Sequence, residues 1–202
     1  MLELAAAALI GYLLGSIPVG FLVAKSKGLD IRKYGSGATG GTNVLRTLGA
    51  GPALATGVTD LLKGLLGAYI GSRLGGDWGY AVGGFFAVVG HSYPVWLKFK
   101  GGKSVATGAG SLVLHHPWGF LGGLAAAIAT IAPTRYVSLG SLVGAVVFTA
   151  IVVFTPGTPM ADKVLAVGAT LVIYIRHWEN IKRLAAGNEN KLGQKARPRP
   201  QA

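Results

Sequence analysis

Long apolar runs alternate along the chain with short polar segments that carry most of its Lys and Arg residues. A helix crosses about 30 Å of hydrocarbon at about 1.5 Å per residue, so roughly 20 apolar residues make one span. The runs at 2–24 and 51–70 reach that length, and Pro18 predicts a kink near the end of the first. The pattern predicts an all-α fold built from membrane-spanning helices.

The distribution of charge decides how many spans the shorter apolar runs after residue 104 form, because Lys and Arg gather on the cytoplasmic side of membrane proteins. If Pro117 separates two spans, only Arg73 and Lys163 lie outside. If 105–132 is instead one kinked span, the basic tail moves outside and the bias disappears. The bias predicts an outside amino terminus, a cytoplasmic carboxyl terminus and seven spans, at about 2–24, 51–70, 80–96, 105–116, 118–132, 136–154 and 163–176.

Composition agrees with a membrane protein. Of 202 residues, 51% are hydrophobic and 13% are charged, against about 25% charge in soluble domains, and the 33 glycines let helices approach closely. The net charge of +12 follows one membrane face, so no nucleic-acid partner is expected. The absence of Cys excludes disulfides and thiolate metal sites. We predict one membrane domain over 1–187 and a basic, disordered cytoplasmic tail over 188–202.

Two charged residues interrupt the second span. Asp60 and Lys63 are three positions apart, which places both on one face of a helix. Ionisable groups inside a membrane face the bundle and pair with one another. We expect an ion pair between them.

The segment from His91 to Thr107 concentrates chemistry that a membrane span does not need. Gly101 and Gly102 precede Lys103, and Ser104 is placed to begin the next helix. Glycines let backbone N–H groups approach a ligand, and a helix N-terminus attracts anions, so a phosphate site is predicted. A Walker A loop is excluded because Leu97 stands where its first glycine belongs. The alternative is that these lysines only flank a span.

Two further polar clusters fall on the same side of the predicted membrane. A glycine-rich loop before Arg46 offers hydroxyl and amide groups, and its members are Ser36, Gly37, Thr42 and Asn43. Arg46 can grip a phosphate bidentately, whereas the alternative is a plain flexible linker. A basic turn then brings Arg135 near Ser138 and Ser141, where the alternative is an interfacial anchor.

The last cluster follows the seventh predicted span. His177 can carry a proton or hydrogen-bond a substrate hydroxyl, and Asn180 lies one helical turn later on the same face. No G-x-S-x-G or H-E-x-x-H spacing is present, so a serine-hydrolase elbow and a zinc site of that kind are excluded. Gly-rich backbone with Lys, Arg, Asn and His stabilises developing negative charge, which fits transfer from a phosphorylated donor.

The ordered motifs together resemble the bacterial acyl-phosphate:glycerol-3-phosphate acyltransferase family. They are GSIP in the first span, GSGATGGTNVLRTLG, the Asp60 and Lys63 pair, GHSYPVWLKFKGGKSVATGAG, TRYVSLGS and HWENIKRLAAGNE. The chain departs from the family pattern at Ala38, Ser104 and Trp178. The resemblance implies a multi-pass enzyme of the bacterial inner membrane with its active site at the cytoplasmic face.

The resemblance also implies a reaction in phospholipid biosynthesis. The acyl group of a fatty acyl phosphate passes to the 1-hydroxyl of glycerol 3-phosphate, without cofactor or metal, giving lysophosphatidic acid and inorganic phosphate. A functional link to an acyl-phosphate-forming enzyme is a further expectation. The implied catalytic residues are Ser36, Arg46, Lys103, His177 and Asn180, and the implied substrate-binding residues are Gly37, Thr42, Asn43, Gly101, Gly102, Ser104, Arg135, Ser138 and Ser141.

Two mechanisms and two classes of protein remain open from the sequence. We favour direct attack of the substrate hydroxyl on the acyl carbonyl, with a substrate phosphate oxygen taking the proton, over a covalent acyl-Ser intermediate. A transporter of a phosphorylated solute is the rival class, although its polar groups would line a path across the bilayer. A structural membrane protein without a ligand would have no use for the glycine-rich loops.

Overall fold

The computed structural model describes residues 1–198, and within them the fold is all-α, with one isolated β-bridge between Tyr34 and Pro198. The prediction of an all-α chain is confirmed. The helices in chain order are α1 (Leu2–Ser16), α2 (Val19–Lys25), η1 (Ile31–Lys33), α3 (Gly41–Leu48), α4 (Ala50–Ser92), η2 (Val95–Leu97), α5 (Val105–Leu112), α6 (Pro117–Thr134), α7 (Val137–Phe154), α8 (Met160–Arg176) and α9 (Trp178–Ala185).

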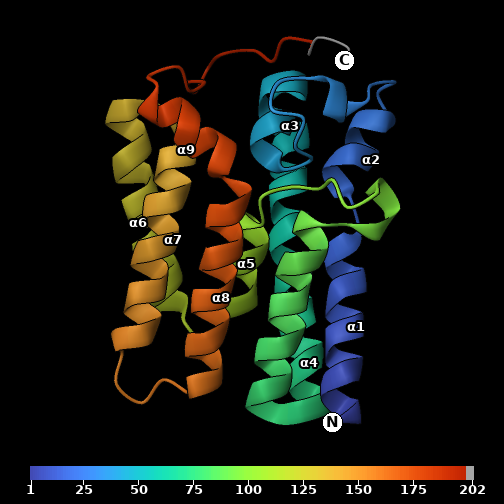
Figure 1. The fold of residues 1–202 in the computed structure, drawn as a ribbon, viewed down its shortest axis with the longest axis vertical. Helices are drawn as coiled ribbons and strands as arrows, with labels where there is room; N and C mark the ends of the chain where they lie inside the picture. Colours follow the sequence, from blue (N-terminus) through green and yellow to red (C-terminus); the bar gives the residue numbers. More distant parts are fainter. Residues whose placement is uncertain (199–202) are drawn as a thin grey trace.

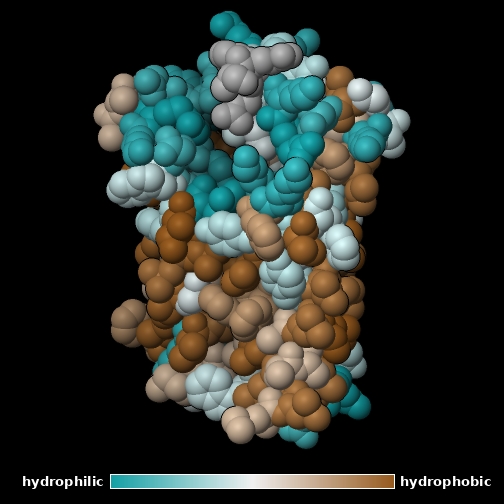
Figure 2. All heavy atoms as spheres, turned by 45° about the vertical axis from the view of Figure 1, so that its right-hand side comes forward, coloured by the Kyte–Doolittle hydropathy of each residue, from teal (hydrophilic) through white to brown (hydrophobic). Residues whose placement is uncertain are grey.

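The long helices stand side by side in one bundle (Figure 1). The short helices α3 and α9 lie at one end, here called the polar end, and the amino terminus lies at the opposite end. On the face shown in Figure 2, hydrophilic side chains gather at the polar end, and a mainly hydrophobic belt lies below it. Four stretches are long and apolar enough to cross a membrane: Leu2–Lys25, Ala50–Leu97, Pro117–Thr134 and Val137–Phe154. This is the architecture of a multi-pass membrane protein.

Prolines and glycines set the breaks between the helices. Pro18 separates α1 from α2, as predicted, and Pro117 opens α6 and separates it from α5. The path of α4 turns back at Gly75 and Gly76, whose backbone angles are not helical, so its two arms correspond to the predicted spans at 51–70 and 80–96. Helix α5 has only 8 residues and is shorter than the span predicted at 105–116.

Glycine allows the first helices to pack with their backbones in contact. A Cβ placed on Gly11 of α1 would lie 2.2 Å from the carbonyl oxygen of Gly83 in α4. A Cβ on Gly64 of α4 would lie 2.0 Å from the carbonyl oxygen of Thr107 in α5. No larger side chain fits at these positions without separating the helices. The contacts make α1, α4 and α5 one closely packed unit beside the site described below.

Residues 188–198 return across the polar end as an extended segment, here called the strap (Figure 1). The Leu192 N–H donates to the Arg135 carbonyl at 2.7 Å, and the Ala196 N–H donates to the Arg46 carbonyl at 3.0 Å. The strap belongs to the predicted disordered tail, of which residues 199–202 lie outside the described part of the chain. The boundary at residue 187 stays a prediction.

Candidate active site

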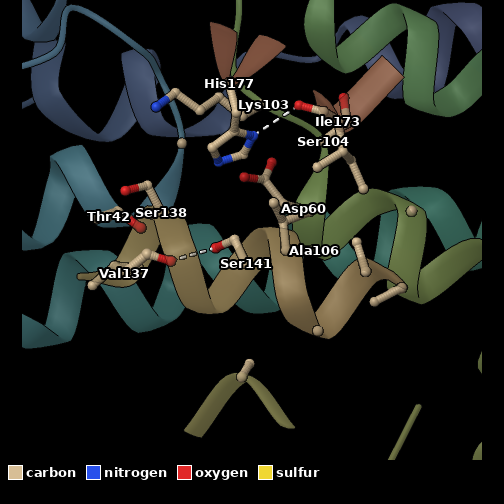
Figure 3. A pocket seen from close by; sticks show the side chains of 18 of the residues that line it. Thr42, Asp60, Lys103, Ser104, Ala106, Val137, Ser138, Ser141, Ile173 and His177 are labelled. Carbon is tan, nitrogen blue, oxygen red and sulfur yellow. Dashed lines mark hydrogen bonds between the residues drawn. The ribbon is translucent and has the colours of Figure 1, made fainter. Parts of the chain in front are cut away.

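One cavity of about 410 Å³ lies between the polar end and the centre of the bundle. It draws its walls from α3, α4, α5, α6, α7, α8 and the turn into α9, so residues far apart in sequence meet there (Figure 3). The predicted site residues that line it are Ser36, Thr42, Asn43, Arg46, Lys103, Ser104, Ser138, Ser141, His177 and Asn180. Those that do not line it are Gly37, Gly101, Gly102 and Arg135.

A buried carboxylate organises the polar wall of the cavity. Glu189 accepts from the Asn180 amide at 2.7 Å, from the Arg183 guanidinium at 2.7 Å and from the Ser138 hydroxyl at 3.2 Å. Asn180 in turn accepts from the Lys103 ammonium. The carboxylate therefore joins α7 and α9 beside the lysine.

The two cationic residues that line the cavity are poised for an anion. Burial is the main cause that lowers the Lys103 pKa to about 8, and the nearby guanidinium groups lower it further. The Arg46 Nε is buried and has no hydrogen-bond partner within residues 1–198, and burial also lowers the Arg46 pKa. A buried cation that lacks a full set of charge and hydrogen-bond partners is stabilised when a phosphate binds beside it.

His177 is neutral at physiological pH. Its Nδ1 lies 2.8 Å from the Ile173 carbonyl oxygen, which requires Nδ1 to carry the proton (Figure 3). Burial, followed by the charge of Lys103, lowers the His177 pKa to about 4. The unprotonated Nε2 is therefore an acceptor on the cavity wall, suited to a substrate hydroxyl.

The glycines before Lys103 do not act as the sequence suggested. The N–H of Gly101 donates to the Ser92 carbonyl at 3.2 Å, and the N–H of Gly102 donates to the His91 carbonyl at 3.0 Å. Their N–H groups thus face the protein and not an anion, which corrects the prediction of a backbone cradle there. The first turn of α5 takes that place, since Val105 and Ala106 line the cavity directly after Ser104.

Arg135 points toward the strap. Its guanidinium donates to the Leu192 carbonyl at 2.8 Å, and its backbone ends α6 in the left-handed region with φ of 62°. Gly37 is also left-handed, at φ of 73°, and shapes the turn before α3. The structure does not bring either residue into the cavity lining, and their predicted contact with substrate stays a prediction.

Asn43 lines the cavity, but its side chain fixes the glycine-rich loop. Its Nδ2 donates to three backbone carbonyls, at 2.9 Å for Ala38, 3.1 Å for Tyr34 and 3.3 Å for Ile31, and its Oδ1 accepts from the Ser36 N–H at 3.2 Å. We expect Asn43→Ala to lower the free energy of unfolding by about 2–3 kcal/mol, because several buried backbone groups lose their partner. Thermal unfolding in detergent measures this, and Thr42→Ser, one position earlier, is the control expected to unfold like wild type.

Three residues of this region were not assigned to the site from sequence. Asp60, His91 and Glu189 also line the cavity, and its polar part, lined by Arg46, Lys103 and Glu189, is here called the mouth. The predicted Asp60–Lys63 ion pair is confirmed at 2.9 Å. In the sequence, Glu189 stands out only as a single Glu in a basic tail. Its contacts become visible only in the structure, where the strap folds back across the polar end.

The inner part of the cavity is apolar. Its walls come from α5, α6, α7 and α8, and the residues are Leu112, Phe120, Gly123, Leu124, Ala127, Phe148, Ala169 and Ile173. Within residues 1–198 no cluster of three or more His, Cys, Asp or Glu side chains is arranged to hold a metal ion. The cavity suits an amphiphile that has an anionic head and an apolar chain.

The apolar helices and the shared bundle define a multi-pass integral membrane protein. The sequence profile of the family described as glycerol-3-phosphate acyltransferase matches residues 5–187, and the chain belongs to this family. The family resemblance drawn from the motifs is therefore confirmed, and it favours an enzyme over a transporter.

Individual relatives agree along the whole chain. A glycerol-3-phosphate acyltransferase of Symbiobacterium thermophilum is 57% identical, covering 98% of this chain and 100% of the relative. That of Thermus thermophilus is 43% identical over 95% and 96% of the two chains. The crystal structure of PlsY (YgiH), an integral membrane glycerol 3-phosphate acyltransferase, in its glycerol 3-phosphate form superposes with a TM-score of 0.89 at 36% identity, covering 94% and 96% of the two chains.

Proposed function

We propose that this protein transfers the acyl group of a fatty acyl phosphate to the 1-hydroxyl of glycerol 3-phosphate, giving lysophosphatidic acid and inorganic phosphate for phospholipid biosynthesis. The observation that carries the proposal is one continuous cavity in which a cationic mouth opens into an apolar arm. Solved PlsY structures in glycerol 3-phosphate and lysophosphatidic acid forms, at 36% identity, support the acceptor and the product.

The donor follows from the chemistry of the mouth. Arg46, Lys103 and the first turn of α5 present charge and N–H groups within a small space, which suits a compact phosphate. A fatty acyl phosphate places that phosphate directly beside the carbonyl carbon, with its chain in the apolar arm. Glycerol 3-phosphate carries a second phosphate and a hydroxyl that His177 Nε2 can accept from.

In the proposed step, the 1-hydroxyl oxygen attacks the acyl carbonyl carbon and the bond from that carbon to the phosphate oxygen breaks. The departing phosphate keeps the bonding electron pair and takes the hydroxyl proton, so no group on the protein changes its protonation overall. Lys103 and the first-turn N–H groups of α5 offset the charge that develops on the phosphate. His177 and Asn180 hold the acceptor in line, which lowers the entropic cost of the encounter.

We also propose the placement of the enzyme in the cell. Seven passes, an outside amino terminus and a cytoplasmic polar end in the bacterial inner membrane agree with the charge bias, because Lys and Arg gather at the end that holds the cavity. Glycerol 3-phosphate, the water-soluble substrate, would then be available from the cytoplasm. A functional link to an acyl-phosphate-forming enzyme on that side remains part of the proposal.

The test uses purified protein in lipid with glycerol 3-phosphate, no added metal, and either acyl phosphate or acyl-CoA as donor. Quantifying both products, we expect equal amounts of lysophosphatidic acid and phosphate from acyl phosphate, undiminished by a chelator. Turnover with acyl-CoA alone would keep the acceptor and overturn the donor. Uptake of labelled glycerol 3-phosphate into sealed proteoliposomes without product would instead support the transporter. An acylated Ser peptide trapped with donor alone would overturn direct transfer.

A further inference from the structure

A buried ionic cluster borders the cavity, with Asp60 and His91 in the cavity lining, and the proposed reaction does not use it. Asp60 Oδ1 lies 2.9 Å from the Lys63 ammonium and 3.4 Å from the His91 Nδ1. The three residues are at most 6% exposed, and they lie on both arms of α4. The Lys63 ammonium also donates to the Ile17 carbonyl at 3.1 Å, at the break between α1 and α2.

The cluster contains one member more than charge balance requires. Removing two charges from water costs several kcal/mol per ion, and an ion pair offsets this only when both partners are well held. Lys63 already neutralises Asp60. The charge of Asp60 is therefore balanced without His91. The contacts of the other side of the imidazole ring, away from Asp60, indicate a different role for this residue.

That side of the ring lies against the glycines before Lys103. A Cβ placed on Gly102 would lie 1.9 Å from the His91 Nε2, and a Cβ on Gly101 would lie 2.2 Å from the His91 carbonyl oxygen. The same carbonyl accepts the Gly102 N–H at 3.0 Å. His91 thus contacts the segment through its ring and through its backbone, and Gly102 does not have a positive φ that would itself demand glycine.

The segment held in this way leads directly to the anion site. Lys103 and Ser104 follow Gly102, and α5 begins at Val105. The Ser104 hydroxyl lies 2.6 Å from that of Ser92, the residue after His91, and donates to the Val88 carbonyl at 2.7 Å. A shift of His91 would therefore move the lysine and the first turn of α5 together.

We propose that His91, oriented by the Asp60–Lys63 ion pair, is a positioning residue that sets the Gly101–Gly102 backbone and thereby places Lys103 for the donor phosphate. Gly102 is glycine because the imidazole occupies the space of its side chain. This inference rests on the proposed function, since the phosphate that it places is that of the acyl donor.

A double-mutant cycle tests the contact. We expect Gly102→Ala to lower kcat/KM for acyl phosphate about 100-fold and His91→Ala about 10-fold, because each displaces the backbone before Lys103. The double variant is expected to match His91→Ala alone, since the added methyl group enters the space that the ring has left. Losses that multiply in the double variant would overturn the proposal.

Further readouts separate positioning from simple destabilisation. We expect Asp60→Asn and His91→Ala to raise KM for acyl phosphate more than KM for glycerol 3-phosphate. His116→Ala is the matched control, because His116 lies 2.9 Å from buried Asp162 in a second Asp–His contact outside the cavity lining. It is expected to lower Tm and leave both KM values unchanged, and equal effects of the two histidine variants on KM would refute a positioning role.

The cycle also distinguishes failure of this inference from failure of the proposed function. If wild-type protein does not use acyl phosphate, the proposed function fails, and the cycle is then scored by the rise in Tm that saturating inorganic phosphate produces. A rise in Tm that is lost in Gly102→Ala, and that is the same in His91→Ala and in the double variant, supports the contact.

If wild type is active and the effects of the two substitutions are additive in both kcat/KM and Tm, only the positioning role fails. If His91→Ala does not fold, His91→Gln takes its place in the cycle. Its side chain leaves less space beside Gly102, so we expect it to restore only part of the activity that Gly102→Ala loses.

Discussion

Lys103→Ala is expected to lower kcat/KM for acyl phosphate about 10²–10³-fold, with most of the loss in kcat. The reason is that a buried ammonium beside the departing phosphate stabilises charge that is largest in the transition state. Turnover of purified variants in lipid, with phosphate release as the readout, measures the loss. Lys100→Ala is the matched control, because Lys100 belongs to the same basic segment, is exposed and does not line the cavity. Near-normal turnover in Lys103→Ala would remove the lysine from the mechanism.

The same lysine predicts the alkaline limb of the pH profile. Burial lowers the Lys103 pKa to about 8, so the free enzyme carries the cation below that pH and loses it as the pH rises through that value. kcat/KM for acyl phosphate is therefore expected to fall above pH 8. Lys103→Arg keeps its charge throughout this range and should move the limb to higher pH, whatever its absolute activity. An unchanged limb in Lys103→Arg would assign the titration to another group.

Glu189→Ala is expected to be the most destabilising single change at the site, costing about 3 kcal/mol in the free energy of unfolding. Glu189 is 5% exposed, and its carboxylate accepts from Asn180, Arg183 and Ser138. Its removal leaves the buried Asn180 amide, the buried Ser138 hydroxyl and the partly buried Arg183 guanidinium without this partner. Activity should fall with it, because Asn180 in turn holds the Lys103 ammonium. Thermal unfolding in detergent and turnover well below the transition measure the two effects separately.

Glu179→Ala is the control for this prediction. Glu179 pairs with Lys182 at 3.1 Å, but both side chains are mostly exposed, and such pairs contribute about 0–1 kcal/mol. The variant should unfold and turn over like wild type. A Glu189→Ala protein as stable as this control would show that the buried carboxylate does not hold the polar wall together.

Much of the fold follows from local chemistry in the sequence. Apolar run length marked the helices, Pro18 and Pro117 marked breaks, and a three-residue spacing marked the Asp60–Lys63 pair. The length of α5 was overestimated, because residues 113–116 are apolar or aromatic and pattern alone cannot end a helix without a turn residue. The chain instead leaves the helix where His115 and His116 turn toward Asp162.

The site was predicted where a residue's type alone defined its chemistry. Lys103, Arg46, His177 and Asn180 were found in this way, and all line the cavity. The contact between Gly102 and His91 was not predicted, because the sequence cannot show that an imidazole eleven residues earlier fills the space beside this glycine.

The strap makes the two ends of the polypeptide unequal as attachment points. Its backbone is hydrogen-bonded to Arg46 and Arg135 beside the cavity mouth, whereas Met1 lies at the other end of the bundle. A purification tag or fluorescent protein fused after the last residue would hang from the segment that borders the substrate entrance. Fusion at the amino terminus keeps that entrance clear and is the arrangement suited to ligand-binding assays on an immobilised surface.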